Sequence, residues 1–198
     1  MTYWTEDQLN SIHTMLNPKS MAIVGATPRM QYGGRFLSAA LRGKDKLRIY
    51  PVNPRYEEIQ GLKSYPSVSD LPETPDVVGI VVSYDQVLNV LKESHAMGTK
   101  AAVVISAGFS ERGETERKDL QMQLTDFAQE SGLRMCGPNC LGLANIKDGL
   151  WASSSSRGVA GLSGNIGLIC QSGASAFGPF LQRAVDESIG FSYIISTG

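Results

Sequence analysis

The chain has 198 residues, of which 42% are hydrophobic and 19% charged, with 18 Lys and Arg against 19 Asp and Glu. At roughly 150 residues per domain, this length predicts one large domain or one and a part, and the composition excludes a disordered, collagenous or coiled-coil protein. The balanced charge argues against a nucleic-acid binder, which normally carries a basic excess. Because no apolar run is long enough for a membrane span and the N-terminus lacks a signal pattern, we expect a cytoplasmic protein with no membrane partner.

The three cysteines are predicted to be reduced thiols, because a chain of this size needs no disulfides. Cys136 and Cys140 are spaced like a metal-binding pair. The sequence has only two histidines, His13 and His95, so we expect no four-ligand zinc site.

Short apolar runs alternate with stretches of helical period over the first 150 residues. Thr5 followed by Gln8 has the capping-box pattern and predicts an N-terminal helix. The runs 21–24, 47–50, 77–82, 101–105 and 133–136 predict five buried strands separated by helices. Continuous apolar strands joined by helices indicate a parallel sheet covered on both faces. The fold class is therefore α/β, with a Rossmann-like doubly wound sheet over residues 1–150.

A second α/β unit is predicted near the end of the chain. Serines at 153–156 and three nearby glycines predict a linker over 151–164. Strands are then expected at 166–170 and 191–195, with a helix reaching Asp186 between them. We expect residues 165–198 to be the truncated start of a second α/β domain, which the family resemblance described below implies to be flavodoxin-like. Its exposed apolar residues would favour disorder or association, including a homo-oligomer.

The turn after the first predicted strand contains Gly25, Ala26, Thr27 and Arg29. In a doubly wound sheet, ligands bind outside the carboxyl ends of the strands, where backbone amides and a helix N-terminus hold phosphate. This turn is therefore a predicted phosphate site. Thr27 replaces the second glycine of the GxGxxG motif, so the match is partial, and a tight turn without a ligand is the alternative.

Asn53 and Arg55 follow the second predicted strand, where an NAD-binding domain normally has a carboxylate for the ribose hydroxyls. A cation in place of that carboxylate favours an adenosine with an extra phosphate, either the 3′-phosphate of coenzyme A or the 2′-phosphate of NADP. The alternative is a proline-stiffened turn in which Arg55 is solvated.

Small residues in later loops would let a ligand approach the backbone closely. Those after the fourth and fifth strands include Ser106, Ala107, Gly108 and Asn139. In the second unit, an anion site is predicted at the helix N-terminus, formed by Gln171, Ser172 and Gly173. A serine hydrolase is not favoured, because Cys170 stands where a nucleophile elbow needs glycine and no histidine is suitably placed.

Five segments in the same order resemble the nucleotide-binding half of the NDP-forming acyl-CoA synthetases, the superfamily of the succinyl-CoA synthetase alpha subunit. They are residues 18–26, 52–54, 106–111, 137–142 and 164–173. The resemblance implies a CoA-binding domain followed by a ligase domain. It also implies an enzyme that converts a carboxylic acid, CoA and ATP into acyl-CoA, ADP and phosphate, through an acyl phosphate and a phosphohistidine.

The resemblance also implies a role for each predicted site residue. The CoA phosphates would lie at Gly25, Ala26 and Thr27, the adenosine at Asn53 and Arg55, and the pantetheine arm at Ser106, Ala107 and Gly108. The rest of the CoA-binding set would be Arg29, Ser83 and Asn139. The helix that opens at Gln171, Ser172 and Gly173 would face the phosphohistidine.

The chain departs from the family pattern in two ways. Neither histidine has the context of the phosphohistidine, which is expected after Gly198, so we expect no catalytic residue here and no activity of the chain alone. Phe177 stands where the succinate-specific subunit has a tyrosine, which weakens succinate as the substrate and leaves other acids open. ATP or ADP with Mg would bind an ATP-grasp domain or partner subunit.

Two alternatives have no ligase function: a stand-alone regulatory or redox-sensing Rossmann protein that binds CoA or NAD(P), and an NADP-dependent oxidoreductase. A stand-alone module would have no reason to begin a second α/β unit. An oxidoreductase would bind NADPH without competition from CoA. In either ligand model, Gly25→Val is expected to block binding without unfolding the domain.

Overall fold

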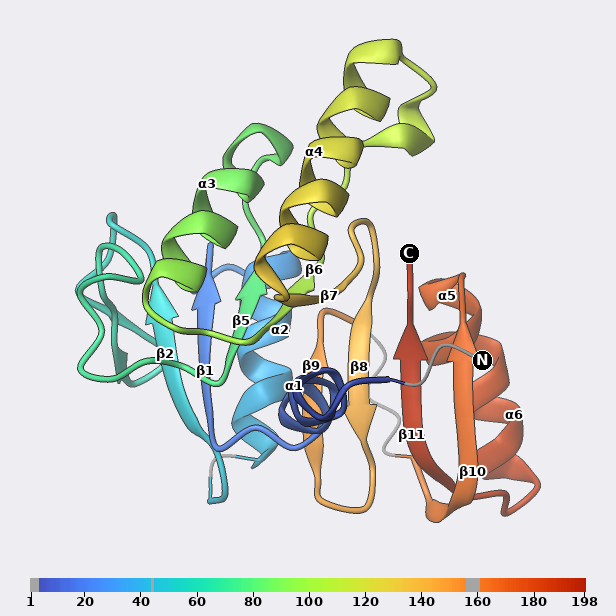
Figure 1. Cartoon of the computed structure of the whole chain (residues 1–198). Coiled ribbons are helices and arrows are strands. Elements are labelled where there is room, and N and C mark those ends of the chain that lie inside the picture. Colours follow the sequence, from blue (N-terminus) through green and yellow to red (C-terminus); the bar gives the residue numbers. More distant parts are fainter. Residues whose placement is uncertain (1–3, 44, 156–160) are drawn as a thin grey trace.

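The computed structural model describes residues 4–43, 45–155 and 161–198. Two sheets lie side by side, with strand orders β2-β1-β5-β6-β7 and β10-β11-β8-β9 (Figure 1). A separate small sheet pairs β3 (Glu58–Ile59) with β4 (Leu62–Lys63). The site of interest lies where the two main sheets approach each other.

The first sheet is parallel throughout and confirms the five predicted strands, with ends shifted by one or two residues. It consists of β1 (Ser20–Val24), β2 (Arg48–Val52), β5 (Val77–Ile80), β6 (Ala101–Val104) and β7 (Arg134–Cys136). The chain runs outward from β1 to β2 and then crosses back to β5 on the other side of β1. Ligands of doubly wound sheets bind at such a reversal, outside the carboxyl ends of the strands.

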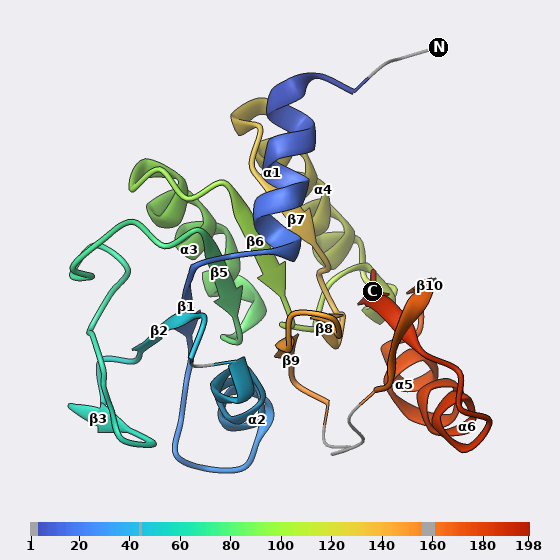
Figure 2. The ribbon, with the colours of Figure 1, turned by 90° about the horizontal axis from the view of Figure 1, so that it is seen from below.

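Alternate residues of the central strands enter two different cores, because successive side chains of a strand point to opposite faces. Ile23 packs with Phe36 of α2 (Tyr32–Ala40). Val24 packs instead with Leu91 of α3 (Tyr84–Ala96) and Leu124 of α4 (Thr115–Ser131). Figure 2 shows α3 and α4 on one face and α2 on the other, so both faces are covered, as predicted.

The N-terminal helix α1 (Glu6–Leu16) confirms the capping-box prediction. The Gln8 N–H donates to Thr5 Oγ1 over 3.2 Å, and the Thr5 N–H donates to Gln8 Oε1 over 3.0 Å. Two backbone donors at the helix start are satisfied in this way.

The second sheet is mixed. It consists of β8 (Gly142–Asn145), β9 (Leu150–Ser153), β10 (Ser163–Cys170) and β11 (Phe191–Ser196), and β8 is antiparallel to both of its neighbours. The strands predicted at 166–170 and 191–195 are confirmed, whereas the β8–β9 hairpin was not predicted. β9 overlaps the start of the expected linker 151–164, of which residues 156–160 lie outside the described residues. The expected domain boundaries stay a prediction.

The prediction of one continuous helix reaching Asp186 is wrong. The segment consists of α5 (Gly173–Ser175), the π-helical η3 (Ala176–Phe180) and α6 (Leu181–Asp186). Gly178 has the non-helical angles φ −113° and ψ −111°, and it precedes Pro179. Proline has no N–H to donate and disfavours a helical residue before it, which accounts for the break. Two short 3₁₀ turns, η1 (Leu41–Gly43) and η2 (Ser110–Arg112), occur in the first unit.

Of the two strands expected to expose apolar surface on the second unit, only β10 does so. Ile166 and Ile169 are 50% and 71% exposed, whereas Phe191 and Ile194 of β11 are buried. Phe191 and Ile194 are buried because they pack in one cluster with Phe177 and Leu181 of the kinked helix. Within the described parts of the chain, no helix combines the length and apolar character that crossing a bilayer requires.

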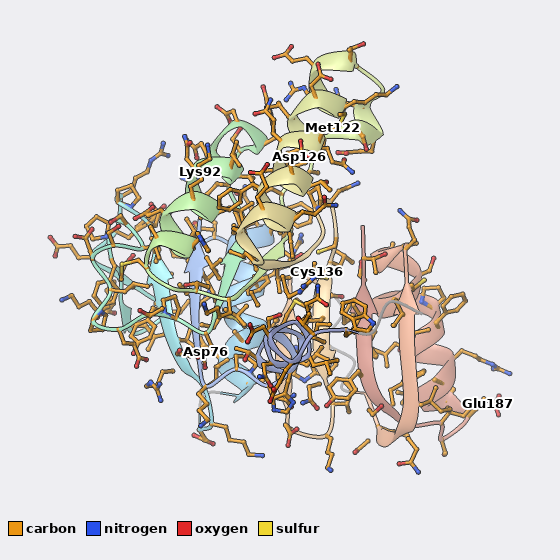
Figure 3. All side chains as sticks on the ribbon, in the orientation of Figure 1. Asp76, Lys92, Met122, Asp126, Cys136 and Glu187 are labelled. Carbon is orange, nitrogen blue, oxygen red and sulfur yellow. The ribbon has the colours of Figure 1, made fainter. Side chains whose placement is uncertain are left out.

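The two sheets are joined by buried polar contacts. Cys136, which Figure 3 places on the side of the first sheet that faces the second, donates from Sγ to the Ser196 carbonyl over 3.1 Å. Asn145 of β8 is fully buried, and its Nδ2 lies 3.2 Å from the Leu16 carbonyl and 2.9 Å from Asp148 Oδ2. The amide therefore connects the end of α1 to the β8–β9 turn.

We predict that Asn145→Ala lowers the free energy of unfolding by about 1–3 kcal/mol, because it leaves the Leu16 carbonyl unpaired. Urea denaturation measures the change. Asn165→Ala is the control, since Asn165 is exposed on β10 and should change stability by less than about 0.5 kcal/mol. Equal effects of the two substitutions would contradict this role for Asn145.

Candidate functional site

A cavity of about 690 Å³ opens at the carboxyl ends of β1, β5 and β6, where the first sheet meets α2, the end of β9 and the kinked helix of the second unit. Six predicted site residues line it: Gly25, Thr27, Ser106, Ala107, Asn139 and Gly173. Eight others do not line it: Ala26, Arg29, Asn53, Arg55, Ser83, Gly108, Gln171 and Ser172. The position agrees with the strand-order reversal between β1 and β5.

The turn after β1 is held by close contacts between backbone segments. Gly25 has φ +88°, and a β-carbon there would overlap the Val81 carbonyl oxygen. A β-carbon at Gly33 of α2 would in turn overlap the Gly25 carbonyl. The Gly25 N–H donates to the Val52 carbonyl over 2.9 Å. Gly25 therefore lets β1, β2, β5 and α2 meet, which is a structural requirement as well as a place for a ligand.

Asn53 and Arg55 lie away from the main cavity. They line a separate pocket of about 480 Å³ at the end of β2, together with Lys63 and Glu57. Asn53 Nδ2 donates to the Ala26 carbonyl over 2.8 Å, and its Oδ1 accepts the Arg55 N–H over 3.0 Å. Asn53 therefore fixes the first turn, and Arg55 and Lys63 give the second pocket two cations.

The loop after β6 is largely satisfied by its own contacts. Ser106 Oγ donates to the Val82 carbonyl over 2.7 Å and accepts the Val82 N–H over 3.0 Å, so it ties the ends of β5 and β6 together. The Glu111 carboxylate accepts the N–H groups of Gly108 and Phe109. These two amides are therefore not free for a ligand.

The loop after β7 brings Asn139 and Cys140 to the cavity, after a cis bond between Gly137 and Pro138. The Asn139 side chain is exposed. The backbone N–H of Asn139 donates to the Ser106 carbonyl over 2.9 Å. The hydrogen bond with Cys136 and burial together raise the pKa of the Cys140 thiol well above its ordinary value. Cys140 is thus a protonated, weakly nucleophilic thiol at neutral pH.

The expected anion site at the helix of the second unit has a different form. Ser172 Oγ accepts the Ser175 N–H over 3.3 Å, which caps α5, but α5 has only three residues before the π-helical segment. Gly173 and Ala174 line the cavity, whereas Gln171 is exposed outside it. A short, interrupted helix has a weaker dipole than the regular helix that we expected.

Several cavity residues were not predicted as site residues. They come from the start of α2, the ends of the strands and the second unit: Gln31, Tyr32, Gly33, Arg35, Val81, Val82, Ile105, Cys140, Leu141, Ser154, Ser155, Ala174, Phe177 and Gly178. The adjacent glycines before Arg35 were a usable signal for a helix start close to the first turn. Ser154 was assigned to a linker because of its serine-rich neighbours. Within the described residues, no three His, Cys, Asp or Glu side chains group as a metal site.

Comparison with known proteins agrees with this architecture. A family model described as a CoA binding domain matches residues 19–146. The chain is 36% identical over 182 residues to subunit alpha of acetate–CoA ligase (ADP-forming) II from Pyrococcus furiosus, covering 92% of this chain and 39% of that protein. It is 39% identical over 181 residues to acetate–CoA ligase (ADP-forming) from Methanocaldococcus jannaschii, covering 91% and 25%.

A solved structure shares the fold over almost the whole chain. It is the dinucleotide-forming acetyl-coenzyme A synthetase 1 of Ca. Korarchaeum cryptofilum, in complex with phosphate and ADP. The TM-score is 0.85 at 38% identity, over 94% of this chain and 39% of that one. The chain therefore belongs to the family of CoA-binding domains, in the form found in ADP-forming acyl-CoA synthetases, and it spans less than half the length of these relatives.

The expectation that Gly25→Val would leave the domain intact is opposed by the overlap of its β-carbon with the Val81 carbonyl. We predict a loss of unfolding free energy of about 3 kcal/mol or more, from backbone strain and overpacking together. Gly61→Ala is the control, since Gly61 has φ +80° but nothing within 4 Å, and it should lose about 1 kcal/mol. Similar urea midpoints for the two variants would contradict the overlap.

We predict that iodoacetamide labels Cys170 faster than Cys140 in the folded chain at neutral pH. Cys140 is buried, and its raised pKa keeps it protonated until the pH is well above neutral, whereas Cys170 is half-buried. Mass spectrometry of timed samples measures the order. Labelling in urea, where all three thiols should react alike, is the control, and equal rates in the folded chain would contradict the prediction.

Proposed function

We propose that this chain is the CoA-binding portion of an ADP-forming acid–CoA ligase. The observation that carries the proposal is a pair of pockets along one sheet edge, a cationic one at the end of β2 and a larger one at the ends of β1, β5 and β6. A long ligand with a phosphorylated adenosine at one end and a reactive group at the other fits such a pair.

The residues present fit CoA at both ends. Arg55 and Lys63 supply charges for the 3′-phosphate. Between the two pockets, the turn at Gly25 and Thr27 brings bare backbone close to the ligand path, because a β-carbon at Gly25 or Gly33 would overlap neighbouring backbone. The reactive end would lie in the larger cavity, near Asn139. When bound, CoA supplies the thiol that accepts the acyl group.

The complete reaction needs residues beyond those of this cavity. His13 and His95 lie on α1 and α3 and do not line it. We propose that the phosphohistidine, the Mg-nucleotide and an ATP-grasp unit belong to a larger assembly, in line with relatives that are subunits of ADP-forming ligases.

For the acid substrate we propose a chemical class and not a single compound. Relatives are named for acetate, 4-hydroxybutyrate and trans-ferulate. Phe177 is buried and lines the cavity with Val81, Val82 and Ile105. This apolar wall favours an aliphatic or aromatic monocarboxylic acid over a dicarboxylic one.

A dinucleotide-binding function is the second candidate, because the carboxylate of Glu57 also lines the β2 pocket. A carboxylate in this region is what an NAD ribose requires. Parallel titrations with CoA, dephospho-CoA, NADP and NAD separate the candidates. Tightest binding of CoA supports the ligase proposal, and binding of NADP or NAD alone contradicts it.

We predict that Arg55→Ala weakens CoA binding by about tenfold or more while dephospho-CoA binding changes little, because a charge-assisted contact to the 3′-phosphate is lost. Isothermal titration measures both affinities. Arg112→Ala, a change of another exposed arginine outside both pockets, is the control. Equal losses for CoA and dephospho-CoA would remove Arg55 from the 3′-phosphate site.

A further inference from the structure

Two buried polar atoms without hydrogen-bond partners belong to residues that border the main cavity. They are Nε of Arg35, on α2, and Oγ of Ser154, which follows β9 and is 0% exposed. Buried polar groups normally have a partner, and leaving one unpaired is costly. Both residues line the main cavity, so a ligand bound there is a candidate partner for both.

Arg35 lies on the part of α2 next to the second unit, and its Cζ lies 4.6 Å from the Tyr32 ring centroid. Ala39, one helical turn later, packs in the same core cluster as Trp151 and Phe177. Arg42, further along the same face, has its Cζ 5.4 Å from the Trp151 ring centroid. The glycines that approach the first turn are Gly33 and Gly34, on another side of α2.

Ser154 is fixed beside the loop that carries Asn139. Its N–H donates to the Leu141 carbonyl over 3.1 Å, and the neighbouring Ser153 hydroxyl donates to the same carbonyl over 2.7 Å. The Ser153 hydroxyl thus has a structural partner, whereas the Ser154 hydroxyl has none among the described residues.

The charge of the cavity defines the ligand. Arg35 is its one charged lining residue in the described chain, with no Asp or Glu among the others. The ion pairs of the described residues are Arg48–Glu73, Arg117–Glu114 and Arg183–Glu187, so Arg35 has no counter-ion among these residues. A guanidinium and a hydroxyl are donors that together suit an oxyanion.

We propose that Arg35 and Ser154 form an oxyanion-binding pair for the carboxylate or inorganic phosphate that reacts beside CoA, not for the CoA diphosphate. This rests on the proposed function, because it assigns the second substrate group of that site. α2 packs beside β9, and Ala39, one turn after Arg35, packs with Phe177, which favours the second substrate over CoA.

The test is isothermal titration of the full chain, in a buffer free of oxyanions, with orthophosphate, acetate and benzoate, each with and without saturating CoA. Arg35→Gln and Ser154→Ala should each weaken binding of the anion by about tenfold and change CoA affinity much less. Binding of orthophosphate alone identifies phosphate as the source, and binding of the carboxylates alone identifies the acid.

Two control variants separate binding from structure. Arg42→Gln removes another cation from the same helix face and should leave anion affinity unchanged. Ser153→Ala should lower the melting temperature, because its hydroxyl is bonded, whereas Ser154→Ala should leave it unchanged or raise it. A melting temperature that falls equally in both serine variants would give Ser154 a structural role and overturn the proposal.

Three further results would also overturn it: no saturable binding of any of these anions by the unmodified chain, unchanged affinity in both site variants, or an equal loss of CoA affinity in Arg35→Gln. Failure of the proposed function would be seen differently, as absence of CoA binding by the unmodified chain.

Discussion

The close approach of backbone segments at Gly25 is the constraint on which the site depends. Segments of β1, β2, β5 and α2 meet where β1 ends, and neither Gly25 nor Gly33 has room for a β-carbon. The cavity opens directly beside this junction, at the ends of β1, β5 and β6. The positive φ of Gly25 turns the chain out of the strand at the same point. The geometry that holds the sheet together also creates the cavity, so stability and binding cannot be varied independently at this residue.

The second unit completes the cavity. The loop after β7 leads directly into β8, and β8 pairs with β11 from the far end of the chain. Cys136 and Ser196 connect the two sheets over 3.1 Å, and the backbone of Asn139 is bonded to Ser106 over 2.9 Å. These contacts bring the kinked helix opposite the carboxyl ends of the first sheet. A CoA-binding sheet alone would present an open edge, whereas this arrangement places a wall across from it.

More of the fold than of the candidate site could be predicted from the sequence. Strong apolar periodicity and the Thr5 cap were enough for the five parallel strands and for α1, because both are local signals. The β8–β9 hairpin was missed because its strands are four residues long and its pairing with β11 is non-local. Motif reasoning located the turn at Gly25 but assigned ligand contacts to Ser106 and Gly108, whose polar groups are occupied by their own chain. Arg35 and Ser154 were not predicted as site residues, because only the tertiary fold brings α2 and β9 together.

Ser153 and Ser154 are neighbours with different roles, one structural and one in the proposed anion site. Both hydroxyls are buried, but within the part of the chain that the structure describes only the first has a partner. In a domain stabilised by only a few kcal/mol, an unpaired buried hydroxyl and a guanidinium without a counter-ion are substantial costs. The apolar residues around Phe177 do not relieve them, since they offer no acceptor. An oxyanion would satisfy both donors at once, and the same groups that weaken the empty domain would then strengthen the bound one, which couples occupancy of the cavity to the junction between the two sheets.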